Sequence, residues 1–296
     1  STVPGKHGEK MVLRILNSDA SALNLDTLIH IKSVREDFRK IMNTTNGIVI
    51  VSGPTGSGKS TTLAAALQEK DTGDTNIVTA EDPIEYDMGG DINQVQVNRA
   101  KGQTFAMILR TFLRQDPDVL LIGEIRDSET ADIAVKFALT GHLVFSTVHA
   151  NDAPGTITRL LDIGIAPFLV GSCLNLVMAQ RLVRRLCNNC KEEYKPTEQE
   201  LGLVGLDPSK VPGPLYRAKG CAECRNTGYK GRLAIFEMIP MARNLRKLVF
   251  DNANEDDIRQ ASLKNGMETL REAGLARVLD GTTTIEEILR STVEEL

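Results

Sequence analysis

The feature that most constrains the fold is the segment GPTGSGKST at residues 53–61. It matches the pattern Gly-x-x-x-x-Gly-Lys-[Ser/Thr], which forms a phosphate-binding loop between a buried strand and a helix. The glycines let the backbone curl so that several N–H groups and the following helix N-terminus face one anion. The spacing predicts that Lys59 binds nucleotide phosphates and that the Ser60 hydroxyl ligates Mg²⁺. The expected nucleotide-binding residues are Gly53, Pro54, Thr55, Gly56, Ser57, Gly58, Lys59, Ser60 and Thr61.

Short apolar runs alternate with helical patterns on both sides of this loop. Strands that alternate with helices predict βαβ units, and therefore an α/β fold with a mostly parallel sheet covered by helices on both faces. The expected strands are residues 9–16, 47–53, 76–80, 93–97, 118–123 and 142–148. The expected helices in the same part of the chain are residues 32–46, 59–69, 104–115 and 128–140.

The pattern becomes mainly helical after residue 150. The longest uncharged stretch, Gly164–Gln180, is marginally short for a membrane span and contains Gly, Pro, Asn and Gln, which favours a buried core helix. The expected elements are helices at 153–163 and 167–186, a Pro- and Gly-rich loop at 196–214, a strand at 232–239, and helices from residue 244 onward with breaks at Gly266 and Gly281.

Composition narrows the possible partners. The chain of 296 residues has a formal net charge of −4, no Trp and only 4% aromatic residues. Nucleic-acid binders usually carry a basic excess or aromatic stacking platforms, so we expect no nucleic-acid partner. A basic run with Arg181, Arg184, Arg185 and Lys191 could face a membrane protein, an anionic lipid or a neighbouring subunit, or form a solvated helix face.

The chain starts with Ser and has no charged-then-apolar start, so we expect a fragment of a longer protein without a signal peptide.

Candidate catalytic side chains follow three of the expected strands. Glu124 follows the apolar run VLLIG, where an Asp that orients the metal is more usual. The segment EDPIEY, with Glu81, Asp82 and Glu85, closes another strand, and His149 closes a third. Carboxyl ends of parallel strands lie at one edge of a sheet, so these side chains should lie near the phosphate-binding loop. Glu124 could hold Mg²⁺ through water or contact the attacking water, His149 could sense the γ-phosphate, and an acid of EDPIEY could merely cap a turn.

Four of the five cysteines form two Cys-x-x-Cys pairs, Cys187 with Cys190 and Cys221 with Cys224, while Cys173 stands alone. The odd cysteine and the missing export signal argue against a secreted disulfide framework and for a reducing compartment. Four thiolates on two turns suit tetrahedral Zn²⁺ with no open position, which is a structural site. Two free dithiol motifs are the alternative.

Four segments in order give the chain a family resemblance. GPTGSGKST, AEDPIEY, LRQDPDVLLIGEIRD and TGHLVFSTVHANDA resemble the Walker A, Asp box, Walker B and His box of the secretion-ATPase superfamily. GCAECRNTGYKGRLAIFEMI resembles the tetracysteine segment of the type IV pilus assembly and type II secretion ATPases. The resemblance implies a RecA-like P-loop ATPase domain with C-terminal helices, a small zinc-binding insert and the remnant of an N-terminal α+β domain. The implied boundaries are 1–24 for the N-terminal remnant and linker, 25–186 for the ATPase core, 187–231 for the tetracysteine zinc motif and 232–296 for the C-terminal strand and helices.

The resemblance also assigns roles to single residues. It implies that Glu85, the last acid of the Asp box, is the general base, and that Glu124 acts on the metal or its waters. His149 matches the His box, and the loop with Ser60 binds ATP and Mg²⁺. The segment HGEKMVLRIL resembles the end of the N-terminal domain, so Arg14 is the implied arginine finger that one subunit supplies to its neighbour.

The resemblance implies a homohexameric ring that is cytoplasmic, peripheral to the inner membrane, and acts on an inner-membrane platform protein. The implied function is an ATP-driven motor for type IV pilus assembly, with a type II secretion ATPase that drives pseudopilus assembly and protein export as the alternative. Two other classes remain open: a nucleic-acid-dependent P-loop ATPase with a zinc ribbon, and a nucleotide-regulated binding module that hardly hydrolyses. The implied cofactors are ATP, Mg²⁺ and Zn²⁺.

Overall fold

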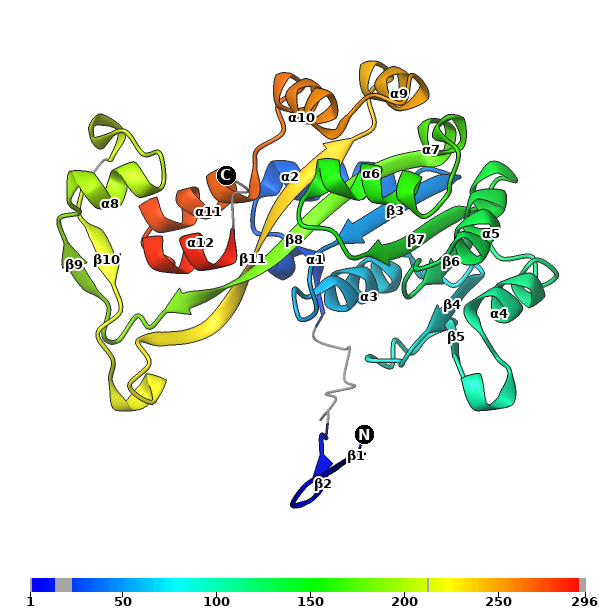
Figure 1. Cartoon of the computed structure of the whole chain (residues 1–296), viewed down its shortest axis with the longest axis horizontal. Helices are drawn as coiled ribbons and strands as arrows, with labels where there is room; N and C mark the ends of the chain where they lie inside the picture. The colour runs from blue at the N-terminus through cyan, green and yellow to red at the C-terminus, as the bar shows by residue number, and fades with distance from the viewer. Residues whose placement is uncertain (1, 14–22, 212, 293–296) are drawn as a thin grey trace.

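A seven-stranded sheet forms the centre of the molecule (Figure 1). The computed structural model describes residues 2–13, 23–211 and 213–292. The strand order is β11-β8-β3-β7-β6-β4-β5, and every neighbouring pair is parallel except β8 with β11. The strands are β3 (Gly47–Ser52), β4 (Ile77–Glu81), β5 (Asn93–Gln96), β6 (Val119–Ile122), β7 (Leu143–Val148), β8 (Leu174–Leu186) and β11 (Tyr229–Pro240).

Helices cover both faces of this sheet, which confirms the α/β class. Side chains alternate along each strand, so Val49 and Val51 of β3 pack on one face while Ile48 and Ile50 pack on the other. The first face is covered by α1 (Leu25–Leu28), α2 (Lys32–Met42) and α3 (Lys59–Lys70). The second is covered by α4 (Phe105–Phe112), α5 (Ser128–Leu139), α6 (Ala153–Asp162), α7 (Pro167–Cys173), α9 (Arg243–Phe250), α10 (Glu255–Lys264), α11 (Leu270–Leu279) and α12 (Ile285–Ser291).

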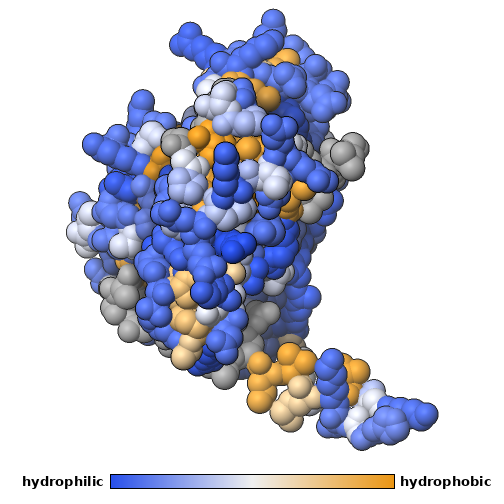
Figure 2. Space-filling view, turned by 90° about the vertical axis from the view of Figure 1, so that its left-hand side faces the viewer, coloured by the Kyte–Doolittle hydropathy of each residue, from blue (hydrophilic) through white to orange (hydrophobic). Residues whose placement is uncertain are grey.

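The strands and helices expected between residues 32 and 163 are confirmed as β3 to β7 and α2 to α6. The strand expected at 9–16 begins as β2 (Gly8–Met11), and residues 14–16 lie outside the described residues. β2 pairs with β1 (Thr2–Gly5) in a hairpin that stands apart from the body of the molecule. Figure 2 shows apolar side chains gathered on this hairpin, where Val3 and Met11 are exposed.

The helix expected at 167–186 is wrong beyond residue 173, and with it the core helix across Gly164–Gln180. The segment folds as α7 followed by the long strand β8. β8 finds hydrogen-bonding partners on both edges, because it runs parallel to β3 and antiparallel to β11. Tertiary pairing of this kind overrides a local helical pattern. Most of the basic run consequently lies along a strand, so the solvated helix face is wrong as well.

Beyond the sheet, β8 and β11 continue as a two-stranded ribbon towards the cysteine region (Figure 1). There β9 (Glu192–Tyr194) pairs with β10 (Leu215–Arg217). A helix, α8 (Glu198–Leu203), forms inside the expected loop 196–214, with a capping box between Thr197 and Glu200 at its start. The loop prediction is therefore incomplete at this point.

The strand expected at 232–239 is confirmed within β11, and the C-terminal helices are confirmed with their breaks at Gly266 and Gly281. The carboxylate of Glu287 on α12 is fully buried and accepts hydrogen bonds from Arg184 at 2.7 Å and from the Arg184 backbone at 2.9 Å. This contact attaches the last helix to the β8–β11 ribbon. Within the described ranges, every helix is too short or too polar to cross a membrane.

Candidate nucleotide site and cysteine cluster

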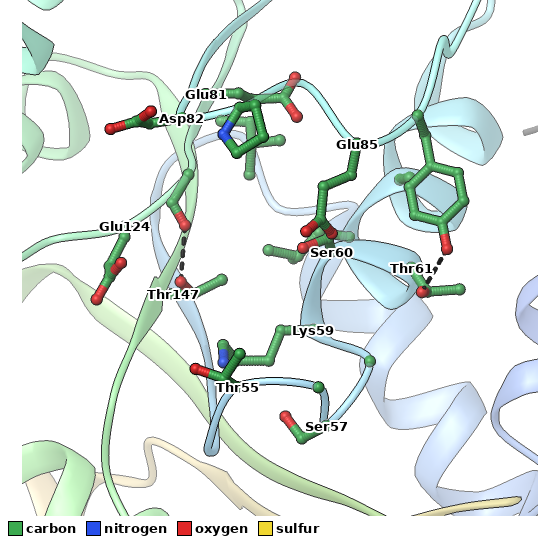
Figure 3. Close-up of a pocket in the computed structure, with 18 of the residues that line it drawn as sticks. Thr55, Ser57, Lys59, Ser60, Thr61, Glu81, Asp82, Glu85, Glu124 and Thr147 are labelled. Carbon is green, nitrogen blue, oxygen red and sulfur yellow. Dashed lines mark hydrogen bonds between the residues drawn. The ribbon is translucent and has the colours of Figure 1, made fainter. Parts of the chain in front are cut away.

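A cavity of about 370 Å³ lies at the carboxyl edge of the parallel strands, beyond the ends of β3, β4 and β6 (Figure 3). Residues 55–61 of the phosphate-binding loop line one side of it. Glu85, Glu124 and His149, which follow three different strands, line the rest together with apolar and basic side chains. The position agrees with the general rule that open parallel sheets bind ligands at their carboxyl edge.

Local backbone geometry explains why two positions of the phosphate-binding loop are occupied by glycine. Helix α3 begins at Lys59, and its N-cap residue Gly58 has a φ of +88°, in the left-handed region. Gly53 has a φ of +148°, and a Cβ atom there would lie 2.5 Å from the carbonyl oxygen of Gln180 and 2.6 Å from the Ser57 hydroxyl oxygen. Both positions therefore require glycine.

Lys59 lies buried against the loop that precedes it. Its ammonium donates hydrogen bonds to the carbonyl oxygens of Gly53 at 2.8 Å and Pro54 at 3.0 Å. Burial lowers the pKa of Lys59, and the negative charges of Glu124 and Glu85 oppose that shift. An anion in the cavity would meet this ammonium and the N-terminus of α3 together.

The loop is also held from β8, through the buried side chain of Gln180. Its amide nitrogen donates to the carbonyl oxygen of Ser57 at 2.8 Å, and its amide oxygen accepts from the Thr62 hydroxyl at 2.9 Å. The next residue, Arg181, donates to the carbonyl oxygen of Asn151, just after the end of β7. Adjacent residues of β8 thus connect the phosphate-binding loop with the His149 segment.

The two outer acids of EDPIEY have different surroundings. The Glu85 side chain points towards Ser60 in the cavity (Figure 3). Glu81 is buried at the end of β4, where its carboxylate accepts hydrogen bonds from the Thr79 hydroxyl at 2.7 Å and the Gln94 amide at 2.9 Å. Burial raises the pKa of Glu81 above its ordinary value, although both hydrogen bonds lower it. Glu81 thus joins β4 to β5, while Glu85 presents its carboxylate to the cavity.

Glu124 enters the cavity from the end of β6. Its carboxylate oxygens lie 3.1 Å from His149 Nε2 and 2.6 Å from Arg126 Nη2, and the side chain is only 15% exposed. The hydrogen bond to Glu124 raises the pKa of Arg126. Nearby, the Thr147 hydroxyl donates to the carbonyl oxygen of Gly123 at 2.7 Å, which joins β7 to the end of β6. The predicted metal-directed acid and the predicted phosphate sensor are therefore in direct contact.

The structure thus brings together most residues singled out in the sequence. Residues 55–61 line the cavity with the three side chains from the strand ends, and Gly53 and Pro54 contact Lys59 through their carbonyl oxygens. Arg14, the expected arginine finger, lies outside the described residues.

Other side chains at the cavity are missed by the sequence analysis. The Tyr86 hydroxyl lies 2.9 Å from Thr61 Oγ1, and Arg126 contacts an acid of the cavity. Tyr86 directly follows Glu85 and Arg126 lies two residues after Glu124, so closeness in sequence to an assigned acid was the available signal. Leu182 and Arg232 line the cavity from β8 and β11. Leu182 was missed because the residues of β8 were predicted as helix, whereas Arg232 lies in the quoted tetracysteine segment but received no role there.

The second candidate site is the cysteine cluster at the end of the β8–β11 ribbon. The four Sγ atoms of the cluster all lie within 4.8 Å of one another. Individual Sγ–Sγ distances are 3.9 Å, 3.8 Å and 3.7 Å. A tetrahedral zinc ion with Zn–S bonds of about 2.3 Å would place its sulfurs about 3.8 Å apart. The donor set and spacing therefore fit a structural zinc ion held by Cys187, Cys190, Cys221 and Cys224.

The surroundings of the sulfurs also suit a metal. The backbone N–H groups of Cys221 and Gly228 each donate to Cys224 Sγ at 3.2 Å, and the Asn189 amide donates to Cys221 Sγ at 3.4 Å. Donors aimed at sulfur stabilise thiolates, which are the form that ligates zinc.

Comparison with known proteins supports the family indicated by the motifs. A family model described as "Type II/IV secretion system protein" matches residues 1–290. The type II secretion system protein E of Pseudomonas aeruginosa is 49% identical over 299 residues, which cover 100% of this chain and 58% of that protein. The type IV pilus assembly ATPase PilB of Myxococcus xanthus is 47% identical over 297 residues, which cover 100% of this chain and 52% of that protein. The chain spans about half the length of these relatives.

Solved structures confirm the fold. The crystal structure of the pilus retraction motor PilT with bound ADP matches with a TM-score of 0.67 and 25% identity, over 98% of this chain and 72% of that one. The ATPase DotB of Yersinia pseudotuberculosis matches with a TM-score of 0.69 and 23% identity, over 98% of this chain and 68% of that one. The α/β ATPase fold expected from the sequence is therefore confirmed.

Proposed function

Because this chain belongs to the family of type II/IV secretion system proteins, we propose that it hydrolyses ATP to drive a secretion or pilus machine. The observation that carries the proposal is the convergence of Lys59, Ser60, Glu85 and Glu124 on one cavity. Phosphoryl transfer to water needs this set: an ammonium and N–H groups for the phosphates, oxygen ligands for a metal, and a carboxylate for the water.

In this proposal the triphosphate of ATP lies against residues 53–61. Lys59 exchanges its bonds to the carbonyl oxygens of Gly53 and Pro54 for oxygens of the β- and γ-phosphates. Phosphate charge favours the ammonium form that burial disfavours. Thr61, which contacts the Tyr86 hydroxyl, lies in the first turn of α3 beside the bound phosphates.

The cavity offers the oxygen donors that Mg²⁺ prefers. The Ser60 hydroxyl would hold the ion, and Glu124 would act on the ion or on its waters. When bound, Mg²⁺ neutralises charge on the β- and γ-phosphates. His149, 3.1 Å from Glu124, would respond to the γ-phosphate through that contact.

Glu85 acts as the general base. Its carboxylate takes a proton from water as the water oxygen bonds to the γ-phosphorus, and the bond from that phosphorus to the bridging oxygen breaks to release ADP. The support for this role is geometric, because Glu85 points into the cavity while Glu81 is engaged with Thr79 and Gln94.

The machine we propose is a homohexameric motor for type IV pilus assembly, located at the cytoplasmic side of the inner membrane and acting on a platform protein. In the ring, Arg14 of one subunit would reach the nucleotide of its neighbour. Relatives named pilus assembly ATPases support this assignment. A type II secretion ATPase is the second candidate, because the protein E relative of Pseudomonas aeruginosa is 49% identical. In either case the cysteine cluster holds Zn²⁺ as a structural ion, and residues 187–231 form the zinc-binding module.

The proposal is tested by ATP turnover per subunit, measured against protein concentration with Mg²⁺, beside Glu85→Gln. We expect turnover to rise steeply with concentration, because subunits complete one another's sites. Glu85→Gln should keep nucleotide affinity and lower turnover on the order of 10²-fold or more. Unchanged turnover in the variant would remove Glu85 from the role of base. Turnover independent of concentration, also with any flanking segments of the gene product present, would contradict the ring motor.

The pathway is tested in the organism that carries the gene. Deletion of the gene should abolish surface pili and leave protein export intact if the motor assembles type IV pili. Loss of export with normal pili would assign it to type II secretion instead. Complementation with the parent gene controls for effects of the deletion on neighbouring genes, and complementation with Glu85→Gln should fail if hydrolysis is required.

A further inference from the structure

The segment that carries Glu85 depends on side chains for its shape. It connects β4, which ends at Glu81, with β5, which begins at Asn93. In the described structure residues 82–92 form no helix or strand. A catalytic carboxylate on such a loop can be held at a defined distance only by contacts from neighbouring elements.

Edge strand β5 supplies such contacts through Gln94. The amide nitrogen of Gln94 donates to the carbonyl oxygen of Tyr86 at 3.0 Å and to Glu81 Oε1 at 2.9 Å. Its amide oxygen accepts from the backbone N–H of Met88 at 2.9 Å. One side chain thus bonds to the last residue of β4 and to two residues in the middle of the loop.

Gln96, two residues further along β5, provides a second contact. Its amide oxygen accepts from the backbone N–H of Ile84 at 3.3 Å. Residues two apart on a strand share one face, so Gln94 and Gln96 point to the same side of the sheet. The backbone immediately before Glu85 and immediately after it is therefore bonded to β5 side chains.

Helix α3 also holds this loop through side-chain contacts. The Tyr86 hydroxyl contacts Thr61, and the Gln68 amide donates to the carbonyl oxygen of Met88 at 3.2 Å. These contacts tie the loop to the helix that follows the phosphate-binding loop, whereas Gln94 ties it to the sheet. Loss of Gln94 alone would leave the loop attached to α3 but tied to β5 side chains only through Gln96, so the segment around Tyr86 and Met88 could shift relative to the sheet.

We infer that Gln94, assisted by Gln96, is a positioning residue that holds Glu85 at the distance from the nucleotide that attack by water requires. The inference rests on the proposed function, in which Glu85 is the general base. A carboxamide suits the task because it donates to the Tyr86 carbonyl and accepts from the Met88 N–H at the same time. A carboxylate at position 94 could only accept.

The first test compares Gln94→Met with the parent in the whole gene product. Methionine keeps the length of the side chain and removes all three hydrogen bonds. We expect turnover at saturating ATP to fall about tenfold, since a small displacement of a catalytic group costs rate. The Kd of a fluorescent ATP analogue with Mg²⁺ should change less than about twofold, because phosphate binding does not use this loop in the proposed mechanism. Asn93→Ala, on the same strand and the other face, is the matched control and should leave both quantities unchanged.

The second test asks whether Gln94 acts through Glu85. In a Glu85→Gln background, Gln94→Met should lower turnover less than about twofold, because the group that it positions is already gone. A merely structural role would lower turnover by the same factor in both backgrounds. Gln94→Glu, which cannot donate to the Tyr86 carbonyl, should lose at least as much turnover as Gln94→Met.

The outcomes separate the inference from the proposed function. Equal losses in the two backgrounds, parent-like turnover in Gln94→Glu, or a loss of nucleotide affinity as large as the loss of turnover would overturn the inference and leave Glu85 as base. Parent-like turnover in Glu85→Gln would overturn the proposed role of Glu85, and the positioning role with it.

Discussion

Gln180→Met tests how strongly the β8 strand supports the phosphate-binding loop. The substitution keeps side-chain length and removes both hydrogen bonds of the buried amide, to the Ser57 carbonyl oxygen at 2.8 Å and from the Thr62 hydroxyl at 2.9 Å. The Ser57 carbonyl then stays buried without its partner, which costs about 1–3 kcal/mol. The Thr62 hydroxyl can turn to a carbonyl of the preceding helical turn, so its loss is nearer about 1 kcal/mol. We expect the free energy of unfolding to fall by about 3 kcal/mol.

The assay is urea unfolding followed by circular dichroism, together with ATP affinity. ATP should bind on the order of tenfold more weakly, because the loop is no longer held in its binding conformation. Thr62→Val is the matched control, since it removes only the second bond, and it should cost roughly a third as much. A Gln180→Met chain within about 0.5 kcal/mol of the parent and with parent-like affinity would refute the reasoning.

Two further predictions concern the zinc module and a buried acid. Elemental analysis should find zinc in the purified protein. Chelation should raise hydrogen exchange within residues 187–231 and leave the exchange of β3 and α3 unchanged. Zinc-free protein, or an equal rise in hydrogen exchange along the whole chain, would contradict a local structural ion. Burial raises the pKa of Glu81 above its ordinary value of 4.5, so its contribution to stability is present below pH 4.5 and is lost as pH rises through the folded pKa. In Glu81→Gln the amide oxygen can still accept hydrogen bonds from Thr79 and Gln94. Urea titrations should therefore show the variant gaining stability relative to the parent as pH rises from 4.5 to neutrality. A difference in unfolding free energy that does not change with pH would contradict the raised pKa of Glu81.

The parts of the site that the sequence determines are those encoded locally. The glycine spacing of residues 53–61 specifies backbone angles that few other residues adopt, and Gly58 has the expected left-handed conformation. The apolar runs before Glu124 and His149 are buried strands in any compact parallel sheet, and their carboxyl ends share one edge. The two Cys-x-x-Cys turns likewise bring their own sulfurs close together before any tertiary contact forms.

The parts that only the tertiary structure decided depend on partners distant in sequence. Residues 174–186 are a strand because β3 and β11 complete their hydrogen bonds, and this strand brings Gln180 and Leu182 to the nucleotide cavity. The residues alone also left open which acid of EDPIEY faces the cavity, and only the family resemblance assigned Glu85. Glu81 turns to Thr79 and Gln94, and Glu85 turns to the cavity, because strand β5 pairs beside β4 and its side chains hold the loop between them. The conformation of residues 174–186 and the direction of these two side chains therefore depend on hydrogen-bond partners that are distant in sequence, which a local sequence pattern does not include.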